Sequence, residues 1–188
     1  KLGLAKQEKA ISSEKIEETL LLRIDWIDTP LGSMIAIADQ ETLYLLEFVD
    51  CEGLEKETKK LQMRLGSEIV PGKTAPILQI RKELNSYFCG DFKGFETPIK
   101  MIGSAFQKEV WSELQRIPFG KTCSYKDIAR AIKRPLAVRA VGSANGSNHF
   151  PIIVPCHRVI NANGALGGYA SGIAKKKWLL AHEKSLQR

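Results

Sequence analysis

Short apolar runs separated by turn residues dominate the first half of the chain. Three runs, at 20–26, 34–38 and 43–48, have the length and composition of β-strands. Two stretches of helical periodicity follow, at 52–65 and 77–88, and a glycine lies at or just after the end of each. The pattern predicts a small α/β unit in which the three strands form an antiparallel meander.

Beyond Pro98 the hydrophobic pattern becomes helical. Apolar residues recur at core spacing in 104–117, and shorter helices are predicted at 125–132 and 136–145. Arg134-Pro135 separates the two shorter helices, and in this basic segment the pair fits a helix-turn-helix. Two helices packed in an ordinary bundle fit this pattern equally well.

The C-terminal segment completes the predicted second unit. Asn161-Ala162-Asn163-Gly164 predicts a β-hairpin that returns through Ala165-Leu166. A flexible loop at 167–172 and a helix at 175–184 follow. We therefore expect an α/β N-terminal domain, a small antiparallel sheet with helices, followed by a mainly helical winged helix-turn-helix domain.

Length and composition limit the class of protein. The 188 residues, 44% of them hydrophobic, suffice for one large domain or two small ones. We expect a linker or loosely ordered segment at 1–18, an N-terminal domain at 19–98 and a C-terminal domain at 99–188. No apolar run is long enough for a membrane span, and the charged N-terminus lacks a signal peptide.

These features predict a cytoplasmic protein without membrane association, close to the nucleoid, or a nuclear protein in a eukaryote. Because the sequence does not begin with Met, we also expect that an upstream domain is possible in the full-length protein. The two halves differ in charge: residues 1–100 carry 14 Lys and Arg against 17 Asp and Glu, whereas residues 101–188 carry 14 against 4. This asymmetry favours nucleic acid as the partner over a merely solubilising basic surface.

A cysteine beside a histidine is the best candidate for nucleophilic chemistry. Cys156 and His157 follow Pro155 and the apolar run 152–154. The thiolate is the reactive form of cysteine, and an imidazole within hydrogen-bond reach favours it. Neighbouring side chains of a strand point to opposite faces, so the two meet only if the chain turns at Pro155. From spacing alone, an ordinary core strand is an equal alternative.

Metal chemistry finds little support in the sequence. The four cysteines lie far apart without a Cys-x-x-Cys pair, which argues against a zinc ribbon and against a disulfide framework. A site built from His149, Cys156 and His157 matches no common ligand spacing. We predict no metal and no cofactor.

Seven ordered motifs between about 104 and 184 resemble those of the alkylguanine–DNA alkyltransferases, also called methylated-DNA–protein-cysteine methyltransferases. The first half resembles the family's variable N-terminal domain much more weakly. The matching stretches are Phe106-Gln107 with Val110-Trp111, Ile117-Pro118-Phe119-Gly120, Ser124-Tyr125, Ala137-Val138-Arg139-Ala140-Val141-Gly142, Ile153-Val154-Pro155-Cys156-His157-Arg158-Val159-Ile160, Gly168-Tyr169 and Leu179-Leu180-Ala181-His182-Glu183.

The resemblance implies direct DNA repair. Cys156 would take an alkyl group from O6-alkylguanine, and from O4-alkylthymine, in double-stranded DNA after nucleotide flipping. His157 would act as base through a water molecule, and Glu183 would orient it. Tyr125 would protonate N3 of the departing guanine, and Asn148 would brace the turn that presents the thiol. A thioether product resists hydrolysis, so the protein would act only once. The protein is also expected to be a monomer.

The resemblance also implies a substrate pocket and a DNA-binding surface. The carbonyls of Cys156 and Val159 would accept hydrogen bonds from the guanine amine, Tyr169 would pack on the base and the Ala170 N–H would lie near O6. Arg139 would fill the vacated base stack, and small residues would lie in the minor groove. The expected DNA-binding residues are Arg139, Tyr125, Ala140, Gly142, Ser143, Asn145 and Ser147.

Two other functions remain open at the level of sequence. A winged-helix regulator, or an alkyltransferase-like protein that only flags damage, would bind DNA without transfer; the latter group lacks the acceptor cysteine, which is present here as Cys156. A cysteine hydrolase using Cys156, His157 and Glu183 would turn over repeatedly.

Overall fold

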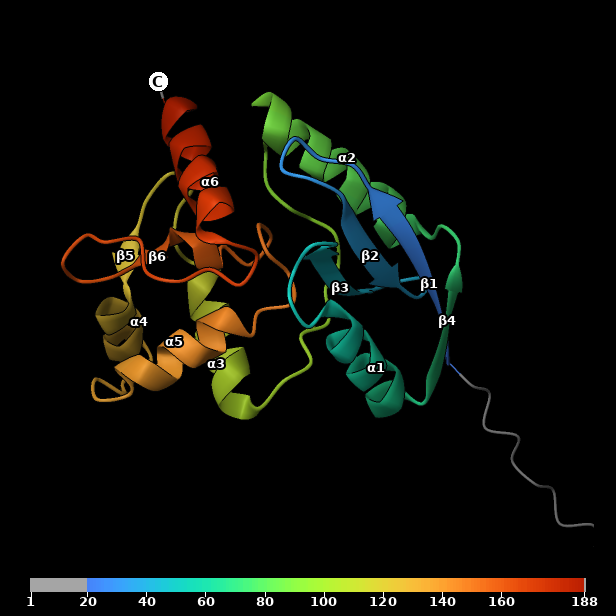
Figure 1. Cartoon of the computed structure of the whole chain (residues 1–188), viewed down its shortest axis with the longest axis horizontal. Coiled ribbons are helices and arrows are strands. Elements are labelled where there is room, and N and C mark those ends of the chain that lie inside the picture. The colour runs from blue at the N-terminus through green and yellow to red at the C-terminus, as the bar shows by residue number, and fades with distance from the viewer. Residues whose placement is uncertain (1–19, 188) are drawn as a thin grey trace, which may run out of the picture.

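The computed structural model describes residues 20–187; the expected linker at 1–18 lies outside the described residues. In the N-terminal half, a four-stranded sheet lies between two helices (Figure 1). The strands, in spatial order β3-β2-β1-β4, are β1 (Leu20–Ile27), β2 (Met34–Ala38), β3 (Leu43–Phe48) and β4 (Ser67–Pro71). The helices are α1 (Leu54–Leu65) and α2 (Ala75–Cys89).

Strand β2 is buried on both faces because a helix covers each side of the sheet. Met34 and Ala36 join the core that includes α2, whereas Ile35 and Ile37 join a second core with Leu61 of α1. Side chains alternate between the two faces of a strand, so an entirely apolar strand fits only this sandwiched position. The three predicted strands are confirmed, and β1, β2 and β3 form the predicted antiparallel meander.

Strand β4 was not predicted from the sequence. It pairs in parallel with β1, from Leu20 opposite Ser67 to Ile24 opposite Pro71, and makes the sheet mixed. Its residues are half-buried or exposed, so it lacks the apolar run that marks the other strands. Pro71, the last residue of β4, has no N–H group to donate. It is tolerated because β4 is at the edge of the sheet and pairs with another strand on one side only.

The C-terminal half consists mainly of helices: α3 (Ala105–Leu114), α4 (Tyr125–Ala131), α5 (Val138–Gly146) and α6 (Ile173–Ser185). Capping boxes at Ser104 and Ser124 fix the starts of α3 and α4. Helices α4 and α5 pack against each other as the helix-turn-helix, and α3 packs on both. The Trp111 indole of α3 donates to the Ala144 carbonyl of α5 at 2.7 Å, which fixes these two helices relative to each other.

The predicted hairpin is wrong. Strand β6 (Val159–Ile160) pairs instead with β5 (Cys123–Ser124), in parallel. A turn does form, because the Gly164 N–H bonds the Asn161 carbonyl at 2.9 Å, but no strand returns from it. Only two residues separate this turn from Gly167-Gly168, and this is too short a stretch to build a ladder.

The apolar run before Cys156 is buried but is not a strand. Ile152 has a φ of 76°, which breaks an extended chain, and residues Cys156–Arg158 form a 3₁₀ helix, η1. Pro155 is the N-cap of η1, so the chain does turn at this proline. The core-strand alternative for this segment is therefore wrong.

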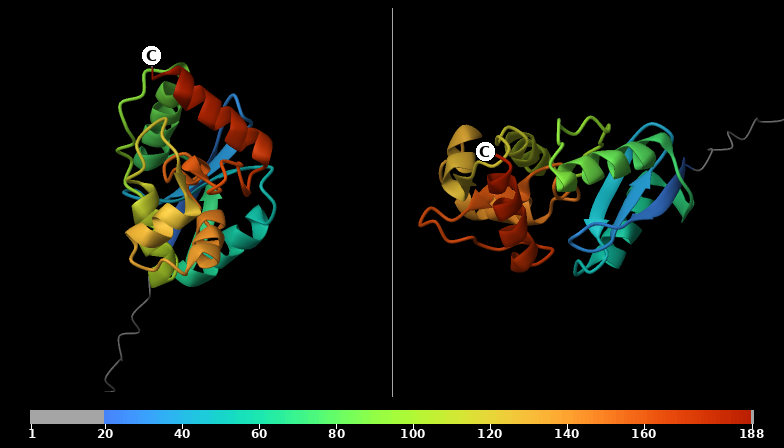
Figure 2. Two further views of the ribbon diagram at one scale, coloured as in Figure 1. Left: turned by 90° about the vertical axis from the view of Figure 1, so that its left-hand side faces the viewer. Right: turned by 90° about the horizontal axis from the view of Figure 1, so that it is seen from above.

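The two halves lie side by side and share one apolar core (Figure 2). That core extends from β2 and α2 to α3, α5 and α6. Backbone hydrogen bonds also join the halves, since the Leu46 N–H of β3 donates to the His149 carbonyl at 2.9 Å. The domain boundary near residue 98 stays a prediction. None of the helices within residues 20–187 is long and apolar enough to cross a membrane.

Candidate active site

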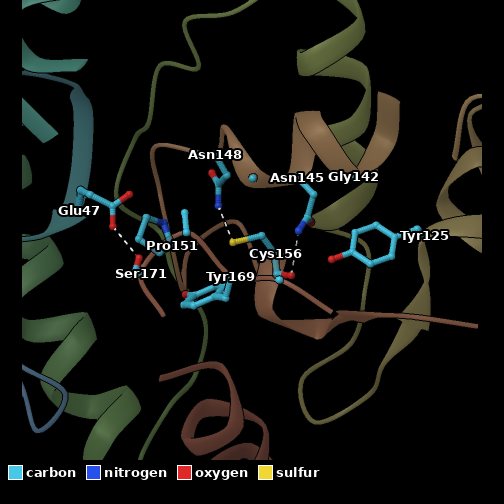
Figure 3. Close-up of a pocket in the computed structure, with 12 residues that line it drawn as sticks. Glu47, Tyr125, Gly142, Asn145, Asn148, Pro151, Cys156, Tyr169 and Ser171 are labelled. Atoms are coloured by element: carbon cyan, nitrogen blue, oxygen red, sulfur yellow. Dashed lines mark hydrogen bonds between the residues drawn. The ribbon is translucent and has the colours of Figure 1, made fainter. Parts of the chain in front are cut away.

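A pocket of about 450 Å³ opens where the sheet half meets the helical half (Figure 3). The Cys156 sulfur faces it near the middle, and the side chain is largely buried, with 6% of the residue exposed. The pocket is lined by Glu47, Tyr125, Gly142, Asn145, Gly146, Asn148, Pro151, Cys156, Gly168, Tyr169, Ala170 and Ser171.

Two asparagines hold the turn that presents Cys156. The Asn148 amide donates to the Val154 carbonyl at 2.8 Å and to the Cys156 sulfur at 3.1 Å, and its oxygen accepts from the Phe150 N–H at 3.0 Å. The Asn145 amide donates to the Cys156 carbonyl at 3.3 Å. These contacts satisfy backbone groups that the irregular segment leaves without partners, and they fix the sulfur in one position.

His157, the residue after the cysteine, forms a buried pair with Glu183. The His157 Nε2 atom lies 2.7 Å from Glu183 Oε1, and both side chains are fully buried. Nε2 carries the proton because it faces a carboxylate, so Nδ1 is left with a lone pair. Nδ1 is itself buried and has no hydrogen-bond partner among the described residues.

Glu183 is held by residues from three other segments. Its carboxylate accepts from Arg158 Nε at 2.8 Å and Nη2 at 3.0 Å, from the Tyr87 hydroxyl at 2.8 Å and from the Gly120 N–H at 2.9 Å. Burial alone would raise the pKa of Glu183, but the hydrogen bonds from His157 and Arg158 lower it to about 2. Burial lowers the pKa of His157, so the pair is a carboxylate and a neutral imidazole.

The pocket favours the thiol form of Cys156 over the thiolate. Burial raises the pKa of Cys156 to about 11, although the Asn148 hydrogen bond and the Lys176 charge oppose this shift. The expectation that the histidine favours a thiolate required a hydrogen bond between the two side chains, and His157 Nδ1 has no hydrogen-bond partner among the described residues. His157 is neutral and directs its N–H to Glu183, so no cation bonds the sulfur.

Lys176 is a buried cation that sequence reasoning missed. The residue is 0% exposed, and its ammonium donates to the Val159 carbonyl at 2.6 Å and to the Gly168 carbonyl at 3.1 Å. From the sequence we expected only a helix at 175–184 and assigned no role to this lysine. Lys176 precedes Leu179 by three positions and Glu183 by seven, so all three lie on the buried face of α6. This spacing could have indicated from the sequence that Lys176 is buried.

The expected pocket residues gather around the cysteine. Tyr125, the first residue of α4, directs its hydroxyl into the pocket from the side opposite Glu47 (Figure 3). Tyr169 lines the pocket, and its buried hydroxyl has no hydrogen-bond partner within residues 20–187. Ala170 is exposed at the pocket rim, and Val159 is buried with its carbonyl bonded to Lys176.

Helix α5 supplies an exposed face next to the pocket. Arg139, Ala140 and Ser143 are exposed, and Arg139 makes no ion pair with another described residue. Gly142 lies one helical turn after Arg139 and lines the pocket. Arg139 therefore stands one turn away from the pocket on the same side of the helix.

Two residues expected on this face are engaged within the protein. Asn145 is buried and its amide bonds the Cys156 carbonyl, while the Ser147 hydroxyl is bonded to Gln107 at 2.8 Å and to the Ala144 carbonyl at 3.0 Å. The burial of Asn145 does not fit a DNA contact through its side chain. Helical periodicity explains why the expected residues do not all share one exposed face: some of the small residues of α5 lie on the side of the helix that packs against η1.

The N-terminal half contributes side chains to the site, which was not predicted. Tyr87 of α2 bonds Glu183, and Glu47 of β3 lines the pocket. Nothing in the local sequence distinguishes Tyr87 from a core aromatic residue of an amphipathic helix. Glu47 interrupts an otherwise apolar strand, and a charge at a buried strand position was the available signal.

Metal ligands do not assemble at the pocket. Over residues 20–187, no three His, Cys, Asp or Glu side chains are grouped as a metal site. His149 is not among the residues that line the pocket and lies 3.7 Å from Glu57. The site as it stands contains a thiol, an acceptor nitrogen and hydrogen-bonding groups, which suits nucleophilic attack by sulfur.

Comparison with known proteins identifies relatives of this arrangement. Residues 105–185 match the family model described as 6-O-methylguanine DNA methyltransferase, DNA binding domain. The methylated-DNA–protein-cysteine methyltransferase of Methanosarcina acetivorans is 40% identical over 84% of this chain and 96% of its own length. The constitutive enzyme of Bacillus subtilis with the same name is 41% identical over 81% of this chain and 89% of its own length.

Solved structures lead to the same group of proteins. The Mycobacterium tuberculosis protein OGT, crystallised in complex with DNA, superposes with a TM-score of 0.74 and 38% identity, covering 88% of this chain and 94% of that one. The O6-methylguanine methyltransferase of the same organism superposes with a TM-score of 0.75. This chain belongs to the methylated-DNA–protein-cysteine methyltransferase family.

Proposed function

We propose that Cys156 accepts the alkyl group from O6-alkylguanine in double-stranded DNA, with His157 and Glu183 as its proton-transfer partners. The observation that carries the proposal is the Cys156 sulfur facing a pocket of about 450 Å³, while the next residue of the same 3₁₀ turn, His157, is paired with Glu183. The described residues of one chain supply every group that the reaction needs, which supports action as a monomer. A DNA substrate implies a site of action at the nucleoid or in the nucleus.

The chemical step is a displacement at carbon. The Cys156 proton passes through a water molecule to the lone pair on His157 Nδ1, and the sulfur attacks the alkyl carbon. A carbon–sulfur bond forms as the bond from carbon to guanine O6 breaks, and the guanine gains a proton as it leaves. Since burial raises the pKa of Cys156 to about 11, we infer that the thiol loses its proton during substrate binding or attack.

Tyr125 is the proposed proton donor to N3 of the departing guanine. Its hydroxyl points into the pocket, and burial raises the pKa of Tyr125, which keeps the phenol protonated until the guanine needs the proton. Any proton that Tyr125 gives up is replaced by the one that left Cys156, so the reaction consumes none. The thioether that results has no easily broken bond, so each molecule reacts once.

Guanine selection is assigned to two backbone carbonyls that are already held in place. The carbonyls of Cys156 and Val159 accept hydrogen bonds from Asn145 and Lys176 respectively. A carbonyl oxygen has two lone pairs, so each retains one for the exocyclic amine of guanine. Tyr169 would pack against the base, and the Ala170 N–H would lie near O6.

The exposed face of α5 is the proposed contact with the DNA minor groove. Gly142 and Gly146 of α5 have free space beside them: a β-carbon added at either position would meet no atom closer than 4.0 Å. Packing within the protein therefore does not require glycine at these positions, although glycine destabilises a helix. Close approach of DNA from outside supplies a reason for both, and Arg139 would enter the stack that the flipped base vacates.

Mass spectrometry of the protein, intact and after digestion, tests the proposal. After incubation with a duplex containing O6-methylguanine, we expect the Cys156 peptide to gain the mass of one CH₂ group, and the Cys156→Ser variant to gain nothing. DNA binding with an unmodified Cys156 peptide would identify a protein that only recognises damage. Demethylated guanine in excess over protein would identify a hydrolase.

A further inference from the structure

The pocket contains a buried carboxylate for which the proposed reaction has no role. Glu47 projects from β3 of the N-terminal half and is only 7% exposed. Its Oε1 atom accepts from the Phe48 N–H at 2.8 Å and from the Ser171 hydroxyl at 3.0 Å (Figure 3). Among the residues from 20 to 187, no Lys, Arg or His side chain forms an ion pair with it.

Glu47 lies at one end of the pocket and Tyr125 at the other, with Cys156 between them (Figure 3). If Tyr125 protonates the guanine, the base occupies the side of the pocket near Tyr125. The reacting carbon then lies between O6 and the Cys156 sulfur. Atoms attached to this carbon must extend into the remaining space, which is bounded by Pro151, Ser171 and Glu47.

We propose that Glu47 makes the pocket selective against alkyl groups that carry a negative charge. The inference rests on the proposed function and adds a determinant of substrate range to it. A methyl group or a neutral substituent meets no charge penalty there, whereas a carboxylate on the transferred carbon would face a second carboxylate away from bulk water. The buried cation Lys176 does not form an ion pair with Glu47; its ammonium bonds the carbonyls of Val159 and Gly168 instead.

The ionisation of Glu47 gives the selectivity a pH dependence. Burial and, to a lesser extent, the Asp50 charge raise the pKa of Glu47 to about 7, against the hydrogen bonds from Phe48, Ser171 and Cys51, which lower it. The other titratable groups that sense Glu47 are Cys51, Cys156 and Tyr169. Discrimination against an anionic alkyl group should therefore increase as the pH rises through neutrality, since more Glu47 is ionised.

The test compares two adducts of nearly equal size in otherwise identical duplexes: O6-carboxymethylguanine, which is anionic, and O6-carbamoylmethylguanine, which is neutral. The quantity measured is the ratio of their single-turnover rate constants, because changes in Cys156 reactivity cancel in it. We expect Glu47→Gln, which keeps the size and the acceptor oxygen, to raise the carboxymethyl to carbamoylmethyl ratio by on the order of tenfold. An unchanged ratio would overturn the inference.

A second measurement needs no variant. In the unmodified protein, the same ratio should fall as the pH is raised from about 6 to about 8, because Glu47 loses its proton in this interval. A ratio that stays constant over this range would also overturn the inference. Transfer of methyl from O6-methylguanine to Cys156 is measured in parallel: its absence would refute the proposed function itself, whereas normal methyl transfer with a constant ratio would refute only the role of Glu47.

Discussion

At the scale of single residues, the chemistry depends on a thiol that is protected until substrate arrives. Burial raises the pKa of Cys156 to about 11, and the neighbouring His157 is kept neutral by its own burial. A protein that reacts only once benefits from this arrangement, because a standing thiolate would be consumed by oxidants and small electrophiles. We therefore expect the acceptor to react slowly with such agents in the absence of DNA.

The reactivity of Cys156 towards iodoacetamide should show this protection. The rate follows the thiolate fraction, which rises about tenfold for each pH unit below the pKa. Alkylation of the Cys156 peptide should be slow at pH 7 and keep rising up to a pH near 11. Exposed Cys89 in the same digest is the internal comparison. A plateau in the Cys156 rate near pH 7 would show a thiolate and contradict the protected-thiol interpretation.

Lys176 gives a second residue-scale prediction. Its ammonium bonds the Val159 carbonyl and favours ionisation of Cys156, so Lys176→Met should slow methyl transfer on the order of tenfold. The folded state should be retained, because methionine suits a buried position and removes a charge that is costly to bury. Transfer rates and thermal unfolding check this, with exposed Lys177→Met as the control. Equal rates for the two variants would contradict the role of Lys176.

At the scale of elements, the regular segments could be read from the sequence and the irregular ones could not. The helices and the first three strands follow apolar periodicity, which burial against a single core imposes. Strand β4 and the β5–β6 pair escaped prediction because their pairing joins short segments far apart in the sequence. A turn at Pro155 was one of two equal alternatives at the level of sequence, and its 3₁₀ form at Cys156 was not predicted.

Helix α5 should show opposite effects on stability and on DNA binding when Gly142 is replaced. Gly142→Ala should raise the free energy of unfolding by about 0.5–1 kcal/mol, since alanine is the better helix former and the nearest atom, in Tyr125, is 4.0 Å from the new β-carbon. Affinity for duplex DNA should fall, because a methyl group separates the helix from the groove. Thermal unfolding and fluorescence anisotropy measure the two effects. Unchanged DNA affinity would argue against α5 as the contact.

Arg139 on the same helix should matter only when a base has to leave a duplex. Arg139→Ala should slow repair of duplex O6-methylguanine on the order of tenfold or more, because the vacated stack is left unfilled. Reaction with the free base O6-methylguanine should be unchanged, since no flipping is needed. Arg130→Ala, at the exposed end of α4, serves as the charge-matched control. Equal losses on duplex and free base would refute the stacking role.

At the scale of the whole molecule, the N-terminal half is part of the active site. The sequence presented it as an α/β unit without catalytic residues, and local patterns gave no means to see that Tyr87 bonds Glu183 across 96 positions. Such contacts depend on how the two halves pack, which periodicity within one helix does not encode. The shared core and the position of Glu47 in the pocket wall also result from the packing of the two halves.

Tyr87→Phe should therefore weaken both the fold and the reaction. The variant loses one hydrogen bond to a buried carboxylate, which we expect to lower the free energy of unfolding by about 1.5–3 kcal/mol. The Glu183 carboxylate would also lose one of the donors that fix its orientation towards His157, so methyl transfer should slow at every pH. Tyr44→Phe is the matched control, because the Tyr44 hydroxyl bonds the Asp39 carboxylate at 2.7 Å, away from the pocket. If both variants transfer methyl at the unmodified rate, the N-terminal half supports Glu183 only structurally; a loss confined to Tyr87→Phe shows that packing between the halves sets the geometry of the catalytic pair.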